Sequence, residues 1–283
     1  MKHLKKINES LNTTSLSKEE VIEILTTKCK KFLSWGKDYT EECLIYRKDE
    51  NRGDFLLVNP KLSSQERIAP YAFKNYHNLL ISNLESWKSW PRRNKSLICA
   101  SSYRALSHAA GFVKGASVNY VIIPFDNTMI ATGDRSDFWN CFANLPKDED
   151  FTEEDLDRPS IAYYMAALVY ELDSSPQPSL NTDWNELKSF LEGSEVSEHI
   201  INKYFTTDYE VLWDDNLNLL QNLNILLNPI SNNFTLTDIT STMNLYSQLD
   251  VNESEALESW FEDESIMIRI DKLTEILKEL NLE

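Results

Sequence analysis

Residues 87–126 combine basic and hydroxyl side chains with short apolar runs, a pattern suited to an anionic ligand. Trp87–Arg93 ends in two arginines, Ser96–Ser102 is a strand-like run that ends in hydroxyls, and Tyr120–Asp126 is a second strand candidate. Neighbouring arginines supply charge and forked donors, whereas serines supply short hydrogen-bonding groups that lose little entropy when fixed. Arginines close to a strand that ends in hydroxyls therefore indicate a site for phosphate or a similar anion.

Several common catalytic motifs are absent from the sequence. Its six glycines form neither a Gly-x-Gly-x-x-Gly turn nor a phosphate loop, and no Gly-x-Ser-x-Gly elbow occurs. Its four histidines lack metal-ligand spacing and its four cysteines form no Cys-x-x-Cys, so we expect no metal site and reduced thiols. Standard dinucleotide folds, nucleotide triphosphatases and zinc hydrolases are therefore disfavoured.

Composition favours a globular, intracellular protein with two differently charged halves. Of 283 residues, 42% are hydrophobic and 11% aromatic, and no apolar run reaches the roughly 20 residues that span a membrane. Residues 1–125 hold 20 basic and 12 acidic residues, whereas residues 126–283 hold 8 and 33, for net charges of +8 and −25. The acidic half is suited to a basic macromolecule, although it is equally consistent with a merely soluble surface.

Hydrophobic periodicity and capping signals predict mixed helices and strands. A capping box at Ser17–Glu20 opens a helix, and residues 256–261 and 265–270 look like a short strand pair around an acidic turn. Further expected elements are strands at 42–47, 55–58, 96–102 and 120–126, and helices at 71–87, 161–172 and 273–282.

Three features stand in an order typical of one enzyme family: Arg47 closing a strand, Ser101 and Ser102 closing another, and acidic residues beside a late strand. In that order the chain resembles the mono-ADP-ribosyltransferases of the arginine–serine–glutamate type, and the likeness is closest to phage-encoded members. The resemblance covers about residues 42–142 and 253–270. The motifs that carry it are Tyr46-Arg47, Trp87–Arg93, Ile98–Ser102, Ala105–Gly111, Val121–Asp126 and Glu258–Phe261.

The resemblance implies a role for one late glutamate. Breaking the bond between nicotinamide and ribose passes through an oxocarbenium-like state, which a carboxylate near the ribose stabilises. By resemblance, Glu258 takes that role, and Glu264 is its rival. The rivalry arises because Glu262-Asp-Glu264 directly precedes an apolar strand, which also matches the wider family. In that arrangement Glu262 would activate the target side chain.

The resemblance also assigns the groups that bind NAD, which is the expected cofactor and is consumed as a substrate. Arg47 would hold the pyrophosphate through its forked donors, and Ser101 or Ser102 would orient the glutamate and the ribose. The family's serine motif usually opens with Ser or Thr, and that position is Ala100 here. Turnover therefore depends on whether Ser101 substitutes for it.

The implied fold is α+β: ADP-ribosyltransferase-like split antiparallel sheets with flanking helices and an acidic helical insertion. Residues 1–40 would form an N-terminal tail and helix, and residues 41–145 the N-terminal part of the core. Residues 146–250 would be the acidic, mainly helical insertion, and residues 251–283 the C-terminal part of the core with its closing helix.

The expected function is NAD-dependent transfer of ADP-ribose to a protein side chain, with arginine as the expected acceptor, on a host or phage target. The acidic half predicts a protein substrate with a basic surface, whereas we expect neither a membrane nor a nucleic acid as partner. The expected location is the cytoplasm of a bacterial host or a phage virion.

Two other functions fit the sequence. One is a catalytically inactive virion or interaction protein that keeps the transferase fold, as Ala100 allows. Ile7-Asn8-Glu9 resembles the cleavage signal of phage head proteases, which would fit association with a phage capsid. The other is an acidic mimic of nucleic acid built on residues 146–264, which follows from charge alone.

Each candidate residue also has a purely structural interpretation. Arg47 fits an ordinary surface arginine, and Ser101 and Ser102 fit caps of a helix that begins near Tyr103. Residues 262–264 fit an exposed hairpin turn, and Arg92 and Arg93 fit a solvated turn after Pro91.

Overall fold

The computed structural model describes residues 11–35, 44–63, 76–101, 117–135, 138–143, 184–193, 214, 216–248 and 256–282. The chain divides into two compact units, which are treated separately below. The first comprises Met1–Arg67, Trp90–Phe138 and Phe234–Glu283, and the second comprises Ile68–Ser89 and Trp139–Asn233. No helix within the described residues is long and apolar enough to cross a membrane.

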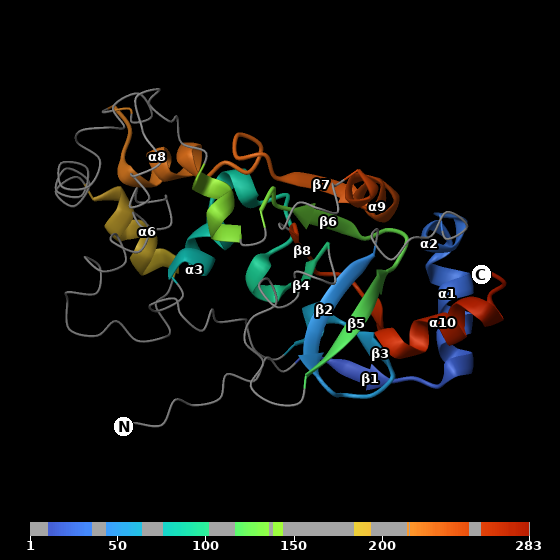
Figure 1. Cartoon of the computed structure of the whole chain (residues 1–283). Helices are drawn as coiled ribbons and strands as arrows, with labels where there is room; N and C mark the ends of the chain where they lie inside the picture. The colour runs from blue at the N-terminus through green and yellow to red at the C-terminus, as the bar shows by residue number, and fades with distance from the viewer. Residues whose placement is uncertain are drawn as a thin grey trace, which may run out of the picture. The chain divides into compact units, whose positions relative to one another are not determined.

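The first unit is built on a large antiparallel sheet, which confirms a fold that mixes helices with antiparallel strands (Figure 1). Within the described residues the sheet has nine strands in the order β1-β3-β9-β5-β2-β4-β8-β6-β7. The strands are β1 (Thr13–Ser15), β2 (Ile45–Glu50), β3 (Phe55–Val58), β4 (Leu97–Ala100), β5 (Ser117–Pro124), β6 (Met129–Thr132), β7 (Thr235–Asp238), β8 (Glu258–Phe261) and β9 (Ser265–Arg269).

Strands β8 and β9 are not neighbours, so the expected strand pair around an acidic turn is wrong. The ladder bonds of β8 go to β4 and β6, whereas those of β9 go to β3 and β5. A strand has only two hydrogen-bonding edges, and both edges of each strand are already paired. The turn at residues 262–264 therefore carries the chain across the sheet between strands that are not adjacent.

Helices of the first unit pack around this sheet. The predicted capping box is confirmed: the Ser17 side chain accepts a hydrogen bond from the backbone of Glu20, whose carboxylate accepts from the Ser17 amide. The C-terminal helix packs on β5 and β9 and lies beside the first helix (Figure 1), where Lys18 pairs with Glu275 and Glu279. These helices are α1 (Lys18–Lys28), α2 (Lys30–Trp35), α9 (Ile239–Ser247) and α10 (Ile270–Glu279).

Strands β4 and β8 lie in the interior, because every residue of both is buried. An apolar strand with neighbours on both edges and packing on both faces needs no solvent-facing side. Polar side chains on such a strand must find partners, since an unpaired buried polar group is costly. Glu258 and Ser259 open β8 with two of them.

The second unit contains helices within its described residues: α3 (Tyr76–Asn83), α6 (Trp184–Glu192) and α8 (Leu219–Leu226), besides a 3₁₀ turn at Glu85–Trp87. The Trp87 indole donates to the carbonyl of Leu227 at 2.7 Å, which joins two segments that are distant in sequence. Trp87 therefore holds the 3₁₀ turn against the residue that follows α8.

The division of the chain differs in detail from the predicted segments. The predicted insertion ran from 146 to 250, whereas β7 and α9 belong to the unit that holds the sheet. The second unit also takes residues 68–89 from the segment predicted as the N-terminal part of the core. The helix expected at 161–172 and the Ile7-Asn8-Glu9 motif lie outside the described residues.

Asp238, which ends β7 and caps α9, predicts a pH dependence of stability. Its carboxylate accepts from Lys31 Nζ at 2.7 Å and from the Ser241 amide at 2.9 Å. The Lys31 hydrogen bond, and then the Ser241 amide, lower the Asp238 pKa from 3.8 to about 2. Because the folded-state pKa is depressed, this contribution is present above 3.8 and is lost as pH falls towards 2.

Replacing Asp238 with Asn keeps the cap acceptor but removes the charge. We therefore expect Asp238→Asn to make the fall in unfolding free energy between about pH 4 and pH 2 shallower. Urea unfolding at a series of pH values measures this slope. An unchanged slope would show that other carboxylates account for the acid sensitivity.

Candidate active site on the central strands

Three central strands bring the main sequence candidates together. Arg47 lies on β2, Ser101 directly follows β4, and Glu258 opens β8, and these strands are consecutive in the sheet. The register pairs Tyr46 with Ala100 and Ala100 with Glu258, so the three residues form one row across the strands. Positions 47, 101 and 258, which are far apart in sequence, therefore lie within one residue of this row.

The row also determines which side chains share a face of the sheet. Directly paired residues of antiparallel strands project to the same side, and successive residues of a strand alternate. Glu258 therefore shares its face with Ala100, whereas Arg47, one residue beyond Tyr46, projects from the opposite face. The missing serine of the family pattern is thus directly across from Glu258.

Glu258 is a buried carboxylate paired with Arg93. Its Oε1 accepts from both Nε and Nη2 of Arg93, at 3.0 and 2.7 Å, and its Oε2 accepts a longer bond of 3.4 Å from the Phe138 amide. Glu258 is 3% exposed and Arg93 7%. Such a pair is strongly held, because removing either partner would leave an uncompensated charge in the interior.

The segment at residues 91–93 contacts Glu258 and Trp260 of β8 and Glu262, which follows the strand. The Trp260 indole donates to the carbonyl of Pro91 at 3.0 Å, between the Arg93–Glu258 pair and a second ion pair. In that second pair Arg92 contacts Glu262 through its backbone amide and its guanidinium, with Nη2 at 3.0 Å from Oε2. Residues two apart on a strand share a face, so three consecutive residues of this segment cover one face of β8.

An aromatic cluster lies against the buried ion pair. The Arg93 guanidinium carbon lies 4.7 Å from the centroid of the Phe138 ring, a cation–π distance. Phe138 in turn meets Phe234 and Trp260, each with ring centroids 5.4 Å apart. These rings exclude water, which strengthens the attraction between the guanidinium and the carboxylate.

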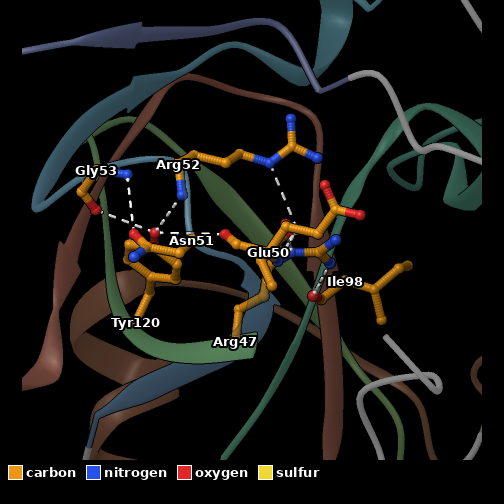
Figure 2. A network of polar contacts seen from close by, with 8 residues as sticks. Arg47, Glu50, Asn51, Arg52, Gly53, Ile98 and Tyr120 are labelled. Carbon is orange, nitrogen blue, oxygen red and sulfur yellow. Dashed lines mark hydrogen bonds and ion pairs between the residues drawn. The ribbon is translucent and has the colours of Figure 1, made fainter. Parts of the chain in front are cut away.

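Arg47 is engaged with the sheet (Figure 2). Its Nη1 donates to the carbonyl of Ile98 on β4 at 2.7 Å, and its Nε donates to Asp49 at 3.0 Å. Asp49 also lies 3.5 Å from Nε of Arg52. With 8% exposure Arg47 is buried, so the interpretation of it as a surface arginine is wrong. Its bond to Ile98 ties β2 to β4 next to the single residue pair that joins them.

The turn after β2 is held by Tyr120, directly opposite Arg47 on β5. Its hydroxyl donates to the carbonyl of Gly53 at 3.0 Å and accepts from the Arg52 amide at 3.1 Å (Figure 2). Burial, more than any other cause, raises the Tyr120 pKa. Tyr120 therefore stays a neutral hydroxyl that fixes the position of the arginine-bearing turn.

Ser101 is held by the backbone of the neighbouring strand. Its hydroxyl accepts from the Leu257 amide at 2.8 Å, and its own amide donates to the Leu257 carbonyl at 3.0 Å. These bonds fix the chain immediately before Glu258, but they do not bring the Ser101 hydroxyl to the carboxylate. Ser102 lies outside the described residues.

The other two acidic candidates lie at the opposite end of β8. Glu262 forms an ion pair with Arg92, and Glu264 accepts a hydrogen bond from the side-chain amide of Asn59 at 3.1 Å. Asn59 follows β3, and three strands stand between β3 and β4 in the sheet. The structure therefore groups Glu258, and not Glu264, with the end of β4, and the interpretation of residues 262–264 as a hairpin turn is wrong.

Sequence reasoning missed two features around Glu258. It assigned Arg92 and Arg93 either to an anionic ligand or to a solvated turn, whereas Arg93 is paired with Glu258 of β8 and Arg92 with Glu262 just after it. The available signal was that Glu258 and Glu262 share one face of an extended segment, where two cations could pair with them. The second feature is a chain of buried hydroxyls on the other side of β8, where Ser259 contacts Thr132 at 2.9 Å and also Tyr246. Such a chain has no pattern in sequence.

Within the part of the chain that the structure describes, no group of three or more histidine, cysteine or acidic side chains is arranged to hold a metal ion. No protein-family model matches the chain, and no curated protein or solved structure matches it significantly. The resemblance to ADP-ribosyltransferases therefore stays a prediction.

The two arginine–glutamate pairs predict very different costs of disruption. Arg93→Met keeps an apolar stem against Phe138 but leaves Glu258 buried without its partner, so we expect unfolding to become easier by about 3–5 kcal/mol. Arg92→Met is the matched control, and because Arg92 is half exposed we expect a loss below about 1 kcal/mol. Urea unfolding measures both values. Equal losses in the two variants would contradict the assignment of the buried pair.

Adding Glu258→Gln to Arg93→Met tests the same coupling from the other side. The double variant no longer buries an unpaired charge, so it is expected to regain part of the lost stability. Strictly additive losses would show that the two side chains do not interact.

Proposed function

We propose that this chain is an NAD-dependent mono-ADP-ribosyltransferase that modifies an arginine side chain of a protein, with Glu258 as its catalytic carboxylate. The observation that carries the proposal is the adjacency of β2, β4 and β8. The resemblance required an arginine, a hydroxyl-bearing strand end and a glutamate from distant segments to converge. The sheet order supports the proximity of the strands that carry Arg47, Ser101 and Glu258, with Arg47 on the face opposite Glu258.

In the proposed reaction, the bond between C1′ of the ribose and the nicotinamide nitrogen breaks, and nicotinamide leaves with the electron pair. The sugar passes through an oxocarbenium-like state, which Glu258 stabilises as an anion close to the ribose. A guanidine nitrogen of the target then forms the new bond to C1′ and releases one proton to water. The guanidine acceptor is what the resemblance implies, and the acidic chain favours the approach of basic protein surfaces.

The short junction between β2 and β4 within the continuous sheet supports this function. These strands share a single residue pair, Tyr46 with Ala100, whereas their other neighbours pair over four to six residues. The family fold expected from sequence has a split sheet that clasps NAD, and this near-division is where such a split would lie. Arg47 sits at it, and exchanging Asp49 for the pyrophosphate would replace one charge-assisted bond with another.

A second function is favoured by the burial of Glu258. A carboxylate that is 3% exposed and ion-paired with Arg93 fits a protein that keeps the transferase fold without turnover, such as a virion or interaction protein. Ala100 opposite Glu258 points the same way, since position 100 offers no hydroxyl to the carboxylate. The two functions differ in whether NAD is bound and consumed.

Incubation with labelled NAD and a bacterial extract distinguishes the two functions. We expect the parent chain to transfer label from NAD to protein in the extract. Glu258→Gln is expected to lower the rate of this transfer by about 10²-fold, because the oxocarbenium-like state loses the anion that stabilises it. Glu264→Gln is the matched control, with little effect, because Glu264 binds Asn59 far from β4. A larger loss in Glu264→Gln would move the catalytic role to that residue.

Ala100→Ser tests whether the transfer rate can be increased. A serine at this position places a hydroxyl opposite Glu258, and we expect the transfer rate to rise. Absence of both transfer and NAD binding in the parent chain and in Ala100→Ser would favour the inactive function.

A further inference from the structure

Glu258 stands opposite an alanine, so the strand next to it offers no hydrogen bond to its carboxylate. Ala100 is fully buried and directly paired with Glu258. Ser101, the next residue, gives its hydroxyl to the Leu257 amide. A buried carboxylate without a hydrogen-bond donor is costly, because a charge in the interior needs a partner. Another group must therefore pair with Glu258 and orient it.

Arg93 meets both requirements. Its Nε and Nη2 converge on Oε1 of Glu258, so the contact fixes this oxygen and supplies a full positive charge. The arginine is itself fixed, since its guanidinium stacks on Phe138 and its backbone belongs to a 3₁₀ turn, Arg93–Lys95, just before β4. The other oxygen, Oε2, has only the 3.4 Å bond from the Phe138 amide.

We propose that Arg93 is a positioning residue that pairs with Glu258 and fixes it through Oε1, supplying the contact that a hydroxyl at residue 100 would otherwise make. This inference rests on the proposed transferase function. Oε2, which is only weakly bonded, is then the oxygen that faces the ribose. Arg93 acts through Glu258 and is not itself assigned a contact with NAD.

The groups packed around Glu258 support this assignment. Among the described residues, Arg93 is the charged side chain that bonds the carboxylate, and the neighbours Phe138 and Ala100 add a backbone amide and a methyl group. Arg92 differs although it is adjacent in sequence: its side chain is half exposed and it binds Glu262. Arg92 is therefore a matched control with the same chemistry outside the site.

Steady-state turnover of NAD with agmatine, a small guanidine, as acceptor tests the inference. Arg93→Gln keeps a donor but removes the charge, and we expect kcat to fall by about 10²-fold while KM for NAD changes by less than about threefold. Arg93→Lys, which restores the charge without the fork, is expected to recover part of kcat. Arg92→Gln is expected to leave kcat within about twofold of the parent.

A second substitution tests the replacement of the hydroxyl. If Arg93 stands in for a serine, Ala100→Ser in the Arg93→Gln background should raise kcat at least about tenfold, by returning a donor to Glu258. The same substitution in the Arg92→Gln background is expected to have a smaller effect. A raised KM with kcat intact in Arg93→Gln would overturn the inference and make Arg93 a ligand-binding residue. Unchanged kcat in a folded Arg93→Gln would overturn it as well.

Failure of the proposed function gives a different result. In that case the parent chain does not consume NAD, and thermal unfolding decides whether Arg93 holds Glu258. Arg93→Gln is expected to lower Tm, and Ala100→Ser is expected to recover part of that loss in this background only. No recovery of Tm in the double variant would overturn the placement of Glu258 by these two positions.

Discussion

The buried ion pair between Arg93 and Glu258 is the constraint on which the centre of this protein depends. It joins the entrance of β4 to the first residue of β8, two segments separated by 165 positions. The pair is almost fully buried, and Phe138, which packs on Phe234 and Trp260, lies over the Arg93 guanidinium. A charge in such surroundings must be paired or neutralised, which makes this contact decisive for the geometry of both strands.

The two faces of β8 are stabilised in different ways. On one face, ion pairs and an indole hydrogen bond attach residues 91–93 to the strand. On the other, Ser259 joins a chain of buried hydroxyls with Thr132 and Tyr246, and burial raises the Tyr246 pKa well above its usual range. Because both faces are satisfied, β8 is rigidly placed, and rigidity is what a positioned carboxylate requires.

The same geometry accounts for both functions that the sequence left open. A transferase needs an ionised carboxylate held close to a ribose, and the ion pair holds one. An inactive relative needs only a stable sheet, and a buried ion pair with an alanine opposite it also provides that. The difference lies in access to Glu258 and in the donor at position 100, and neither is a matter of fold.

The sequence by itself determined the local elements and the order of the candidate residues. The capping box at Ser17 and the strand at Phe55–Val58 follow from short-range chemistry that side chains carry wherever the chain folds. Strand neighbours, faces and ion-pair partners were decided only by tertiary structure. They depend on which edges are free and on one-residue register, so sequence reasoning wrongly joined β8 to β9 and missed the Arg93–Glu258 pair.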